Sequence, residues 1–237
     1  MNKPQLSIVL PVFNEDENVI PVLEKILQKV SLSSLEILVV YDFPEDTTIP
    51  AVQRFQRQNR QVILVENRIG RGVLNAIKTG FNTAKSDYVL VTMADGSDEP
   101  GDILPMLKLA HDGAHVVAGS RYMSGGKQIG GPRLKRTLSK IAGLSLYYSK
   151  ALPIHDATSN FRLYSKYLLD LITIESSAGF ELGLELTVKA QRKKLLIKEV
   201  PTTWRDRTSG ESHFDLWRWL PHYLKWYFYA LASKFQR

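Results

Sequence analysis

The stretch Val91-Thr92-Met93-Ala94-Asp95-Gly96-Ser97-Asp98-Glu99-Pro100 leads from an apolar segment straight into a cluster of acids. The apolar run at 88–92 predicts a buried strand, so the acids lie where that strand ends. Ligands of open α/β sheets bind outside the carboxyl ends of the strands. Asp95 and Asp98 there suit Mg²⁺ or Mn²⁺, and a diphosphate is the natural partner of such a metal. An acidic turn that caps the next helix is the alternative.

Short apolar runs and helical patterns alternate on both sides of this stretch. The expected strands are 6–12, 36–41, 62–66, 88–92, 114–118 and 195–200, and the expected helices are 19–30, 49–58, 72–84, 103–110, 134–150 and 180–191. This alternation predicts an α/β fold with a doubly wound, mostly parallel sheet flanked by helices. A mobile, glycine-rich connector is expected at 124–132.

Composition narrows the class of protein. With 237 residues and 44% hydrophobic content, the chain can bury one large core or two small ones. The net charge of +7 favours an anionic partner, such as a phosphorylated substrate or an anionic membrane surface. We expect no nucleic acid, because neither a recognition helix nor an aromatic β platform is visible. The absence of cysteine excludes disulfides and thiolate metal sites. Residues 1–5 hold no apolar signal core, so a cytoplasmic location is expected.

Polar residues and glycines follow the first three predicted strands. The candidates for binding a nucleotide there are Pro11, Asn14, Glu15, Asp42, Gly70 and Gly72. An acid after the second strand can hold a ribose hydroxyl or a base edge. The glycines before the third helix permit close approach of an anion, and Arg71 between them adds a cation. Taken singly, each of these residues could equally be an ordinary turn or helix-start residue.

The order of these motifs resembles that of family 2 glycosyltransferases with the GT-A nucleotide-sugar-binding fold. Further motifs resemble the dolichyl- and polyprenyl-phosphate sugar transferases within it: Gly119-Ser120-Arg121-Tyr122, Asp156-Ala157-Thr158-Ser159-Asn160-Phe161-Arg162 and Arg207-Thr208-Ser209-Gly210-Glu211-Ser212. The resemblance covers roughly residues 6–213. The chain departs from it at Tyr41, where an acid is usual, and at Phe43-Pro44, which replace Gly-Ser. Met93 takes the first place of the usual Asp-x-Asp metal motif, with Asp95 in the second.

The resemblance implies an inverting transfer from a GDP- or UDP-sugar to a polyprenyl or dolichyl phosphate at the cytoplasmic face of a membrane. It also implies one GT-A catalytic domain over 1–213, with a donor half at 1–123 and an acceptor half at 124–213. Asp95 and Asp98 would hold Mg²⁺ or Mn²⁺, and Arg207 would clamp the donor diphosphate. The acceptor phosphate would contact Arg121, Lys135, Arg136, Ser139 and Ser159.

Several alternatives stay open on the sequence alone. Lys135 and Arg136, together with Lys140, could form a solvated helix face instead of a phosphate site. Glu181 and Glu185, four residues apart, could contact the sugar, act as a base or form a surface pair. Transfer to a saccharide hydroxyl, or a degenerate protein that only binds nucleotide sugars, would use the same donor motifs. A second copy of the chain or a membrane protein could also be a partner.

The C-terminal segment 214–237 is rich in aromatic residues and holds three of the four tryptophans of the chain, Trp217, Trp219 and Trp226. Arg218, His222, Lys225 and Tyr229 recur there at helical spacing and form one polar strip. This composition predicts an amphipathic helix that lies in the membrane interface as a peripheral contact. A final helix packed on the core or on another subunit would have a similar composition. In that case, the membrane contact would have to be sought on the basic helix near Lys135.

Overall fold

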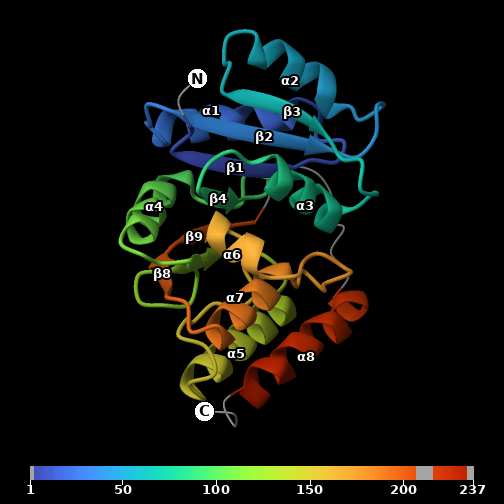
Figure 1. Cartoon of the computed structure of the whole chain (residues 1–237). Coiled ribbons are helices and arrows are strands. Elements are labelled where there is room, and N and C mark those ends of the chain that lie inside the picture. The colour runs from blue at the N-terminus through green and yellow to red at the C-terminus, as the bar shows by residue number, and fades with distance from the viewer. Residues whose placement is uncertain (1–2, 207–215, 234–237) are drawn as a thin grey trace.

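The computed structural model describes residues 3–206 and 216–233, and in the last helix it describes the side chains of 219–232. Its centre is a seven-stranded sheet with the order β3-β2-β1-β4-β7-β5-β8 (Figure 1). The strands are β1 (Leu6–Pro11), β2 (Leu35–Tyr41), β3 (Val62–Glu66), β4 (Tyr88–Val91), β5 (Val116–Ser120), β7 (Arg162–Ser165) and β8 (Ile197–Pro201). All pairs are parallel except those of β7, which runs antiparallel between β4 and β5. The expected mostly parallel α/β sheet is confirmed.

Helices cover both faces of this sheet, because successive residues of the central strands point to opposite sides. On one side, Ile8 and Leu10 pack against α1 (Val19–Lys29), α2 (Thr48–Gln56) and α4 (Ile103–His111). On the other side, Val9 packs in the cluster formed with α3 (Val73–Thr83), α5 (Arg133–Tyr148), α7 (Leu182–Arg192) and α8 (Leu216–Ser233). Burial on both faces explains why β1 and β2 read as continuous apolar runs in the sequence.

Three strands and one helix were not expected from the sequence. β7 has the buried Arg162 at its start, and α6 (Lys166–Leu171) follows it directly. The segment 124–132, expected to be a mobile connector, instead contains β6 (Lys127–Ile129), which pairs in parallel with β9 (Thr203–Arg205). This small second sheet joins the segment after β5 to the segment after β8. Short 3-10 turns at η1 (Asp16–Asn18) and η2 (Pro100–Asp102) complete the described elements.

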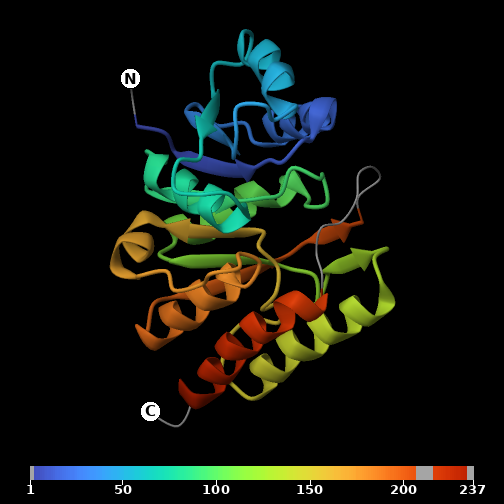
Figure 2. The same ribbon diagram turned by 90° about the vertical axis from the view of Figure 1, so that its right-hand side faces the viewer.

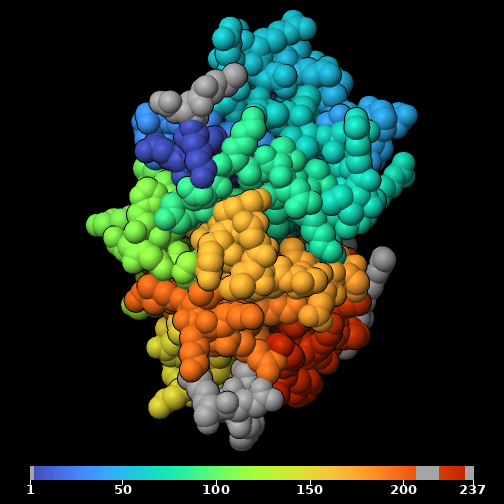
Figure 3. Space-filling view, in the orientation of Figure 1, coloured from blue at the N-terminus to red at the C-terminus, as the bar shows by residue number. Residues whose placement is uncertain are grey.

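The C-terminal helix α8 forms where the sequence predicts a helix, but it packs on the protein. Trp226 is 2% exposed and Ala230 is fully buried in the core cluster. The hydroxyl of Tyr223 donates to the carbonyl of Phe180 at 2.6 Å, and the Trp219 ring meets the Phe180 ring edge-on at 5.0 Å. Figure 3 shows the red surface of α8 beside the orange surface of α7.

The expectation that Trp226 inserts into a membrane is therefore wrong, because this side chain is buried where α8 packs on α7 and α5. Trp219 is half-buried and packs on the Phe180 ring. The side chains of Trp217 and Arg218 lie outside the described residues. Within the described ranges, no helix combines the length and the apolar character needed to cross a membrane.

Candidate active site

Sheet topology brings the ends of three neighbouring strands to one edge. β4 and β5 end there, and β7 begins there because it runs antiparallel between them. The acids Asp95 and Asp98 follow β4, Arg121 follows β5, and the loop 153–160 leads into β7. The backbone N–H of Arg205, at the end of β9, donates to the carbonyl of Ser97 at 2.9 Å. The predicted metal ligands and the predicted acceptor residue Arg121 thus lie at the same edge.

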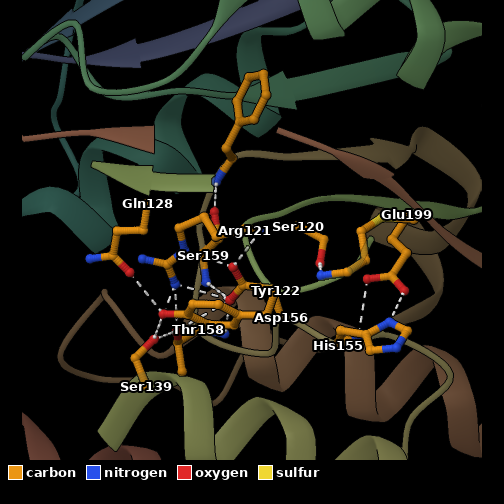
Figure 4. Close-up of polar contacts among 12 residues, drawn as sticks. Ser120, Arg121, Tyr122, Gln128, Ser139, His155, Asp156, Thr158, Ser159 and Glu199 are labelled. Carbon is orange, nitrogen blue, oxygen red and sulfur yellow. Dashed lines mark hydrogen bonds and ion pairs between the residues drawn. The ribbon is translucent and has the colours of Figure 1, made fainter. Parts of the chain in front are cut away.

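Arg121 is held by a buried carboxylate. Its Nε donates to Asp156 Oδ2 at 2.7 Å and its Nη2 donates to Asp156 Oδ1 at 3.0 Å (Figure 4). Burial by itself raises the pKa of Asp156, but the charge and hydrogen bonds of Arg121 outweigh it and lower that pKa below its ordinary value. The ion pair fixes the guanidinium at the end of β5. Asp156 belongs to a motif seen in the sequence, but nothing there indicated this role.

Two hydroxyl groups accept hydrogen bonds from the outer end of the same guanidinium, and a third hydroxyl bonds to one of them. Nη2 of Arg121 donates to Thr158 Oγ1 at 2.8 Å and to Ser139 Oγ at 3.1 Å. The hydroxyl of Tyr122 lies 2.8 Å from Ser139 Oγ, and the Arg121 guanidinium lies 4.9 Å from the Tyr122 ring centre. We call Arg121, Tyr122, Ser139, Asp156 and Thr158 the arginine cluster. Because Ser139 lies on α5, the cluster ties this helix to the sheet edge, as Figure 4 shows.

The other predicted acceptor residues differ in position. Ser139 belongs to the arginine cluster, and Arg136 on α5 is exposed. Burial raises the pKa of Tyr122, and the charge of Arg136 acts against this rise, so Arg136 lies within electrostatic reach of the cluster. Lys135 is half-buried on the same helix. Ser159 is buried, and its hydroxyl accepts from the backbone N–H of Phe161 at 3.2 Å. The structure thus gives Ser159 a role inside the loop that precedes β7.

The acids after β4 influence each other. Asp95 is half-buried and accepts from the backbone N–H of Ser97 at 3.0 Å. Asp98 is buried and accepts from the Thr92 hydroxyl at 2.9 Å. Burial, followed by the negative charge of Asp95, raises the pKa of Asp98 to about 7. The positive charge of Arg121 acts in the opposite direction, so these acids lie within electrostatic reach of the arginine cluster.

The donor set at this loop fits a hard divalent cation. A second acid raises the pKa of Asp98, so a cation beside both carboxylates would stabilise their charged forms. Among the described residues, no group of three or more histidines, cysteines or acids gathers as a metal site. Mg²⁺ and Mn²⁺ suit such a sparse set, because they commonly bind through one or two carboxylates and fill their remaining positions with phosphate oxygens and water.

The residues after β2 and β3 that were predicted to bind the nucleotide form hydrogen bonds with one another. Asp42 accepts from Asn67 Nδ2 through one oxygen and from the backbone N–H of Gly72 through the other, each at 2.7 Å. Asn67 Nδ2 also donates to the carbonyl of Gly70 at 2.6 Å. Gly72 has a φ of 111°, in the region that favours glycine, and it caps α3. Asp42 therefore shapes the glycine loop, and Asn67 is a partner that sequence reasoning missed.

A second pair of loops, after β1 and β2, is joined by Asp46. This buried carboxylate accepts from the backbone N–H groups of Asn14, at 3.2 Å, and of Thr48, at 2.9 Å. Asn14 has a φ of 51° and its side-chain carbonyl accepts from the N–H of Thr47. Glu15 is half-buried nearby, whereas Pro11 is buried at the end of β1 and can only support the loop. Asp46 was not predicted, because a lone acid in a turn gives no signal of long-range bonding.

An aromatic cluster lies at the same ends of β1 and β2. The rings of Phe13 and Phe43 meet edge-on with their centres 5.7 Å apart. The Arg71 guanidinium lies 5.1 Å from the Phe43 ring centre. Phe13 is half-exposed, so an apolar ring reaches solvent beside a cation from the glycine loop. Phe43 is one of the residues at which the sequence departs from the resembled family.

The remaining predicted residues either serve other purposes or cannot be placed. Glu185 is fully buried and accepts from the backbone N–H groups of Glu175 and Ser176, at 2.6 and 2.8 Å. Glu181 is also buried and accepts from the N–H of Gly179 at 2.7 Å. Both acids therefore hold the loop before α7 and are neither a surface pair nor placed to meet a sugar. Arg207 lies outside the described residues.

The chain is similar in sequence to known proteins, among which are the following two. A dolichol-phosphate mannosyltransferase from Pyrococcus furiosus is 28% identical over 232 residues, which are 94% of this chain but only 64% of that protein. A polyprenol monophosphomannose synthase from Mycolicibacterium smegmatis is 29% identical over 211 residues, covering 86% of this chain and 79% of that protein. The chain thus spans slightly less than two thirds of the length of the Pyrococcus protein.

Solved structures show the same fold at low sequence identity. Glucosyl-3-phosphoglycerate synthase from Mycobacterium tuberculosis, in complex with Mn²⁺, UDP and phosphoglyceric acid, has a TM-score of 0.66 and 16% identity over 98% of this chain and 78% of that one. A mannosyltransferase from Pyrobaculum calidifontis, in complex with GDP-mannose and Mn²⁺, has a TM-score of 0.67 and 18% identity over 100% of this chain and 66% of that one.

These neighbours confirm the expected GT-A fold. The sequence profile of glycosyl transferase family 2 matches residues 7–172. This range includes the ends of β1 to β5 and the whole of β7 and α6. The chain belongs to glycosyl transferase family 2.

Proposed function

We propose that this chain transfers a sugar, with inversion, from a nucleoside-diphosphate sugar to a polyprenyl or dolichyl phosphate. One observation supports the proposal most strongly: two groups of opposite charge lie at the same edge of the sheet. The acidic pair Asp95 and Asp98 suits the metal-bound diphosphate of a donor, and the arginine cluster beside it suits a second anion. The names of the relatives from Pyrococcus and Mycolicibacterium support a lipid phosphate as that second anion.

This acceptor needs little activation by the protein. A phosphate monoester has a second pKa of about 6, so at neutral pH it is largely a dianion and already a nucleophile. One of its oxygens attacks the anomeric carbon, and the bond between that carbon and the diphosphate breaks on the opposite face. A strong general base is not needed, which agrees with the structural use of Glu181 and Glu185.

The protein's part is then to place two anions together and to stabilise the leaving diphosphate. Asp95 and Asp98 would hold Mg²⁺ or Mn²⁺, which would act as a Lewis acid on the diphosphate. Arg121, oriented by Asp156, and Ser139 would meet the acceptor phosphate, with Lys135 and Arg136 adding positive charge from α5. The complexes of two structural neighbours with Mn²⁺ support a divalent metal.

We place the donor nucleotide along the ends of β1 to β4. Asp42 and Gly72 would support its ribose and phosphates through the glycine loop, and Arg207 would clamp the diphosphate. The backbone N–H of Arg205 bonds the acidic loop, and Arg207 follows Arg205 by two residues in the sequence, which supports this role for Arg207. The half-exposed Phe13, with Phe43 and Arg71, offers an apolar and cationic edge against which a nucleobase can stack.

The test is a transfer assay with radiolabelled GDP- and UDP-sugars. We expect label to move to a polyprenyl phosphate, and the same polyprenol without its phosphate is the matched control that should stay unlabelled. Asp95→Asn should remove most turnover because it withdraws one of the two carboxylates. Label that reaches only saccharide hydroxyls would overturn the lipid-phosphate acceptor. Binding of nucleotide sugars without any transfer would mean that the chain is a binding protein.

A further inference from the structure

An apolar stripe runs along the outer side of α5. Leu134, Leu138, Ile141 and Tyr148 are 59%, 37%, 59% and 74% exposed. Their spacings of four, three and seven residues place them on one face of a helix. A surface helix of a soluble protein normally turns such a stripe toward the core. Here the stripe faces away from it.

The inner side of α5 is fixed, so this outward orientation follows from the fold. Ser139 reaches the arginine cluster, and Leu146 is fully buried. At Gly143 the helix backbone comes so close to the carbonyl oxygen of His155 that a Cβ would lie 2.2 Å from it. α5 therefore cannot roll to bury its apolar stripe without losing these contacts.

α8 widens the same outer surface. It runs alongside α5 at the end of the molecule away from α2, as Figure 2 shows, and the hydroxyls of Ser145 and Tyr227 lie 2.9 Å apart. Leu224 and Phe228 of α8 are 40% and 61% exposed, while Trp226 on the opposite side of that helix is buried. We call the α5 stripe together with these two residues the α5–α8 face.

The charge of the α5–α8 face indicates which kind of partner binds there. Residues 133–150 contain five basic residues and no acid: Arg133, Lys135, Arg136, Lys140 and Lys150. Residues 216–233 contain two more basic residues and again no acid. Two copies of the face would bring like charges together, which disfavours self-association. Apolar side chains along a helix with cations beside them match the headgroup region of an anionic bilayer.

We propose that the α5–α8 face docks on an anionic membrane surface, with the apolar stripe inserted among the headgroups. This docking rests on the proposed function for its purpose, because α5 carries Ser139 on its inner side. A lipid phosphate held in the same membrane would then have only the thickness of one helix to cross to reach the arginine cluster. The membrane contact therefore belongs to the outer side of α5 and α8, and Trp226 of α8 stays inside the protein.

The test is flotation of the full chain with vesicles of phosphatidylcholine, with and without about one third of phosphatidylglycerol. Wild type should bind the anionic vesicles. The double variant Leu134→Gln/Ile141→Gln should bind at least about tenfold more weakly, because both changes fall on exposed apolar positions. Tyr167→Gln/Leu171→Gln is the matched control, since it removes two exposed apolar side chains from α6 and should bind normally.

Charge is tested with Arg133→Gln/Lys140→Gln, which should lose the preference for anionic vesicles. Wild type that binds neither kind of vesicle, or α5 variants that bind like wild type, would overturn the proposal. A change of molar mass in solution upon Leu134→Gln/Ile141→Gln would identify a protein interface instead. Transfer to a short, water-soluble prenyl phosphate needs no membrane, so this assay fails if the proposed function is wrong and succeeds if only the docking is wrong.

Discussion

At the scale of single residues, Asp98 is the group most sensitive to a bound cation. Its pKa is raised to about 7 by burial and by Asp95, so near neutral pH the carboxyl carries a proton about half of the time. A divalent metal binds the carboxylate form and must displace that proton. Proton release is thus a signature of metal binding that does not depend on turnover.

We predict that binding of Mn²⁺ weakens as the pH falls from about 8 to about 6, approaching tenfold per unit below the pKa. Asp98→Asn should bind Mn²⁺ more weakly and lose this pH dependence, whereas the exposed Asp170→Asn should behave like wild type. Calorimetry in two buffers of different ionisation enthalpy measures the released protons. Equal pH slopes for wild type and Asp98→Asn would remove Asp98 from the metal site.

Asp156 is predicted to matter for stability as well as for the site. Asp156→Asn leaves the buried guanidinium of Arg121 without its counter-charge, and breaking such a pair costs about 3 kcal/mol or more. Because its pKa is lowered in the folded protein, the stabilisation is fully present above the unfolded pKa of about 4 and is lost as the pH falls through the folded value.

Urea unfolding of wild type and Asp156→Asn at several pH values measures this contribution. The gap between the two proteins should narrow below about pH 4. Asp170→Asn should leave the unfolding midpoint unchanged. A gap that stays constant down to the acid limit would mean that the pair contributes through packing instead of charge.

At the scale of elements, the sequence predicts those helices and strands that have a clear hydrophobic periodicity. Six of the seven strands of the main sheet were predicted within about two residues of their observed ends, because most of them are largely apolar runs. β7 was missed because it starts with Arg162, a charged residue that normally signals exposure. Here its guanidinium donates to the carbonyls of Ser159, Gly183 and Asp156 inside the core.

The candidate site divides in the same way. The place of Asp95 and Asp98 could be predicted, because they follow a recognisable strand. Arg121 was indicated by the resemblance of its motif to the family. The partnership of Arg121 with Asp156 could not be predicted, since it depends on an antiparallel strand that was not expected. Asp42 looked like a ligand of the nucleotide, yet both of its oxygens hold the glycine loop. Such contacts between loops leave no periodic signal in the sequence.

At the scale of the whole molecule, α8 links the core to the proposed membrane surface. Its composition suits an interfacial helix and a packed helix equally, and only its tertiary contacts distinguish the two. Trp226 lies under the Nζ atoms of Lys189 and Lys225, which are 4.9 and 4.6 Å from its ring centre, and it is buried in the core cluster. One side of α8 therefore stabilises the fold and leaves the other side exposed.

We predict that Trp226 and Phe228, two residues apart on α8, have opposite roles. Trp226→Ala should destabilise the protein by about 3 kcal/mol or more in the absence of vesicles, because it opens a large cavity under the helix. Phe228→Ala should change the unfolding free energy by no more than about 0.5 kcal/mol, since the ring is exposed, but it should weaken binding to anionic vesicles.

Deletion of 214–237 should unfold or aggregate the chain, not merely release it from membranes. Urea unfolding and vesicle flotation on the same two variants test the pair. If Trp226→Ala kept full stability and lost vesicle binding, Trp226 would be a membrane anchor and the packing of α8 would have no energetic weight.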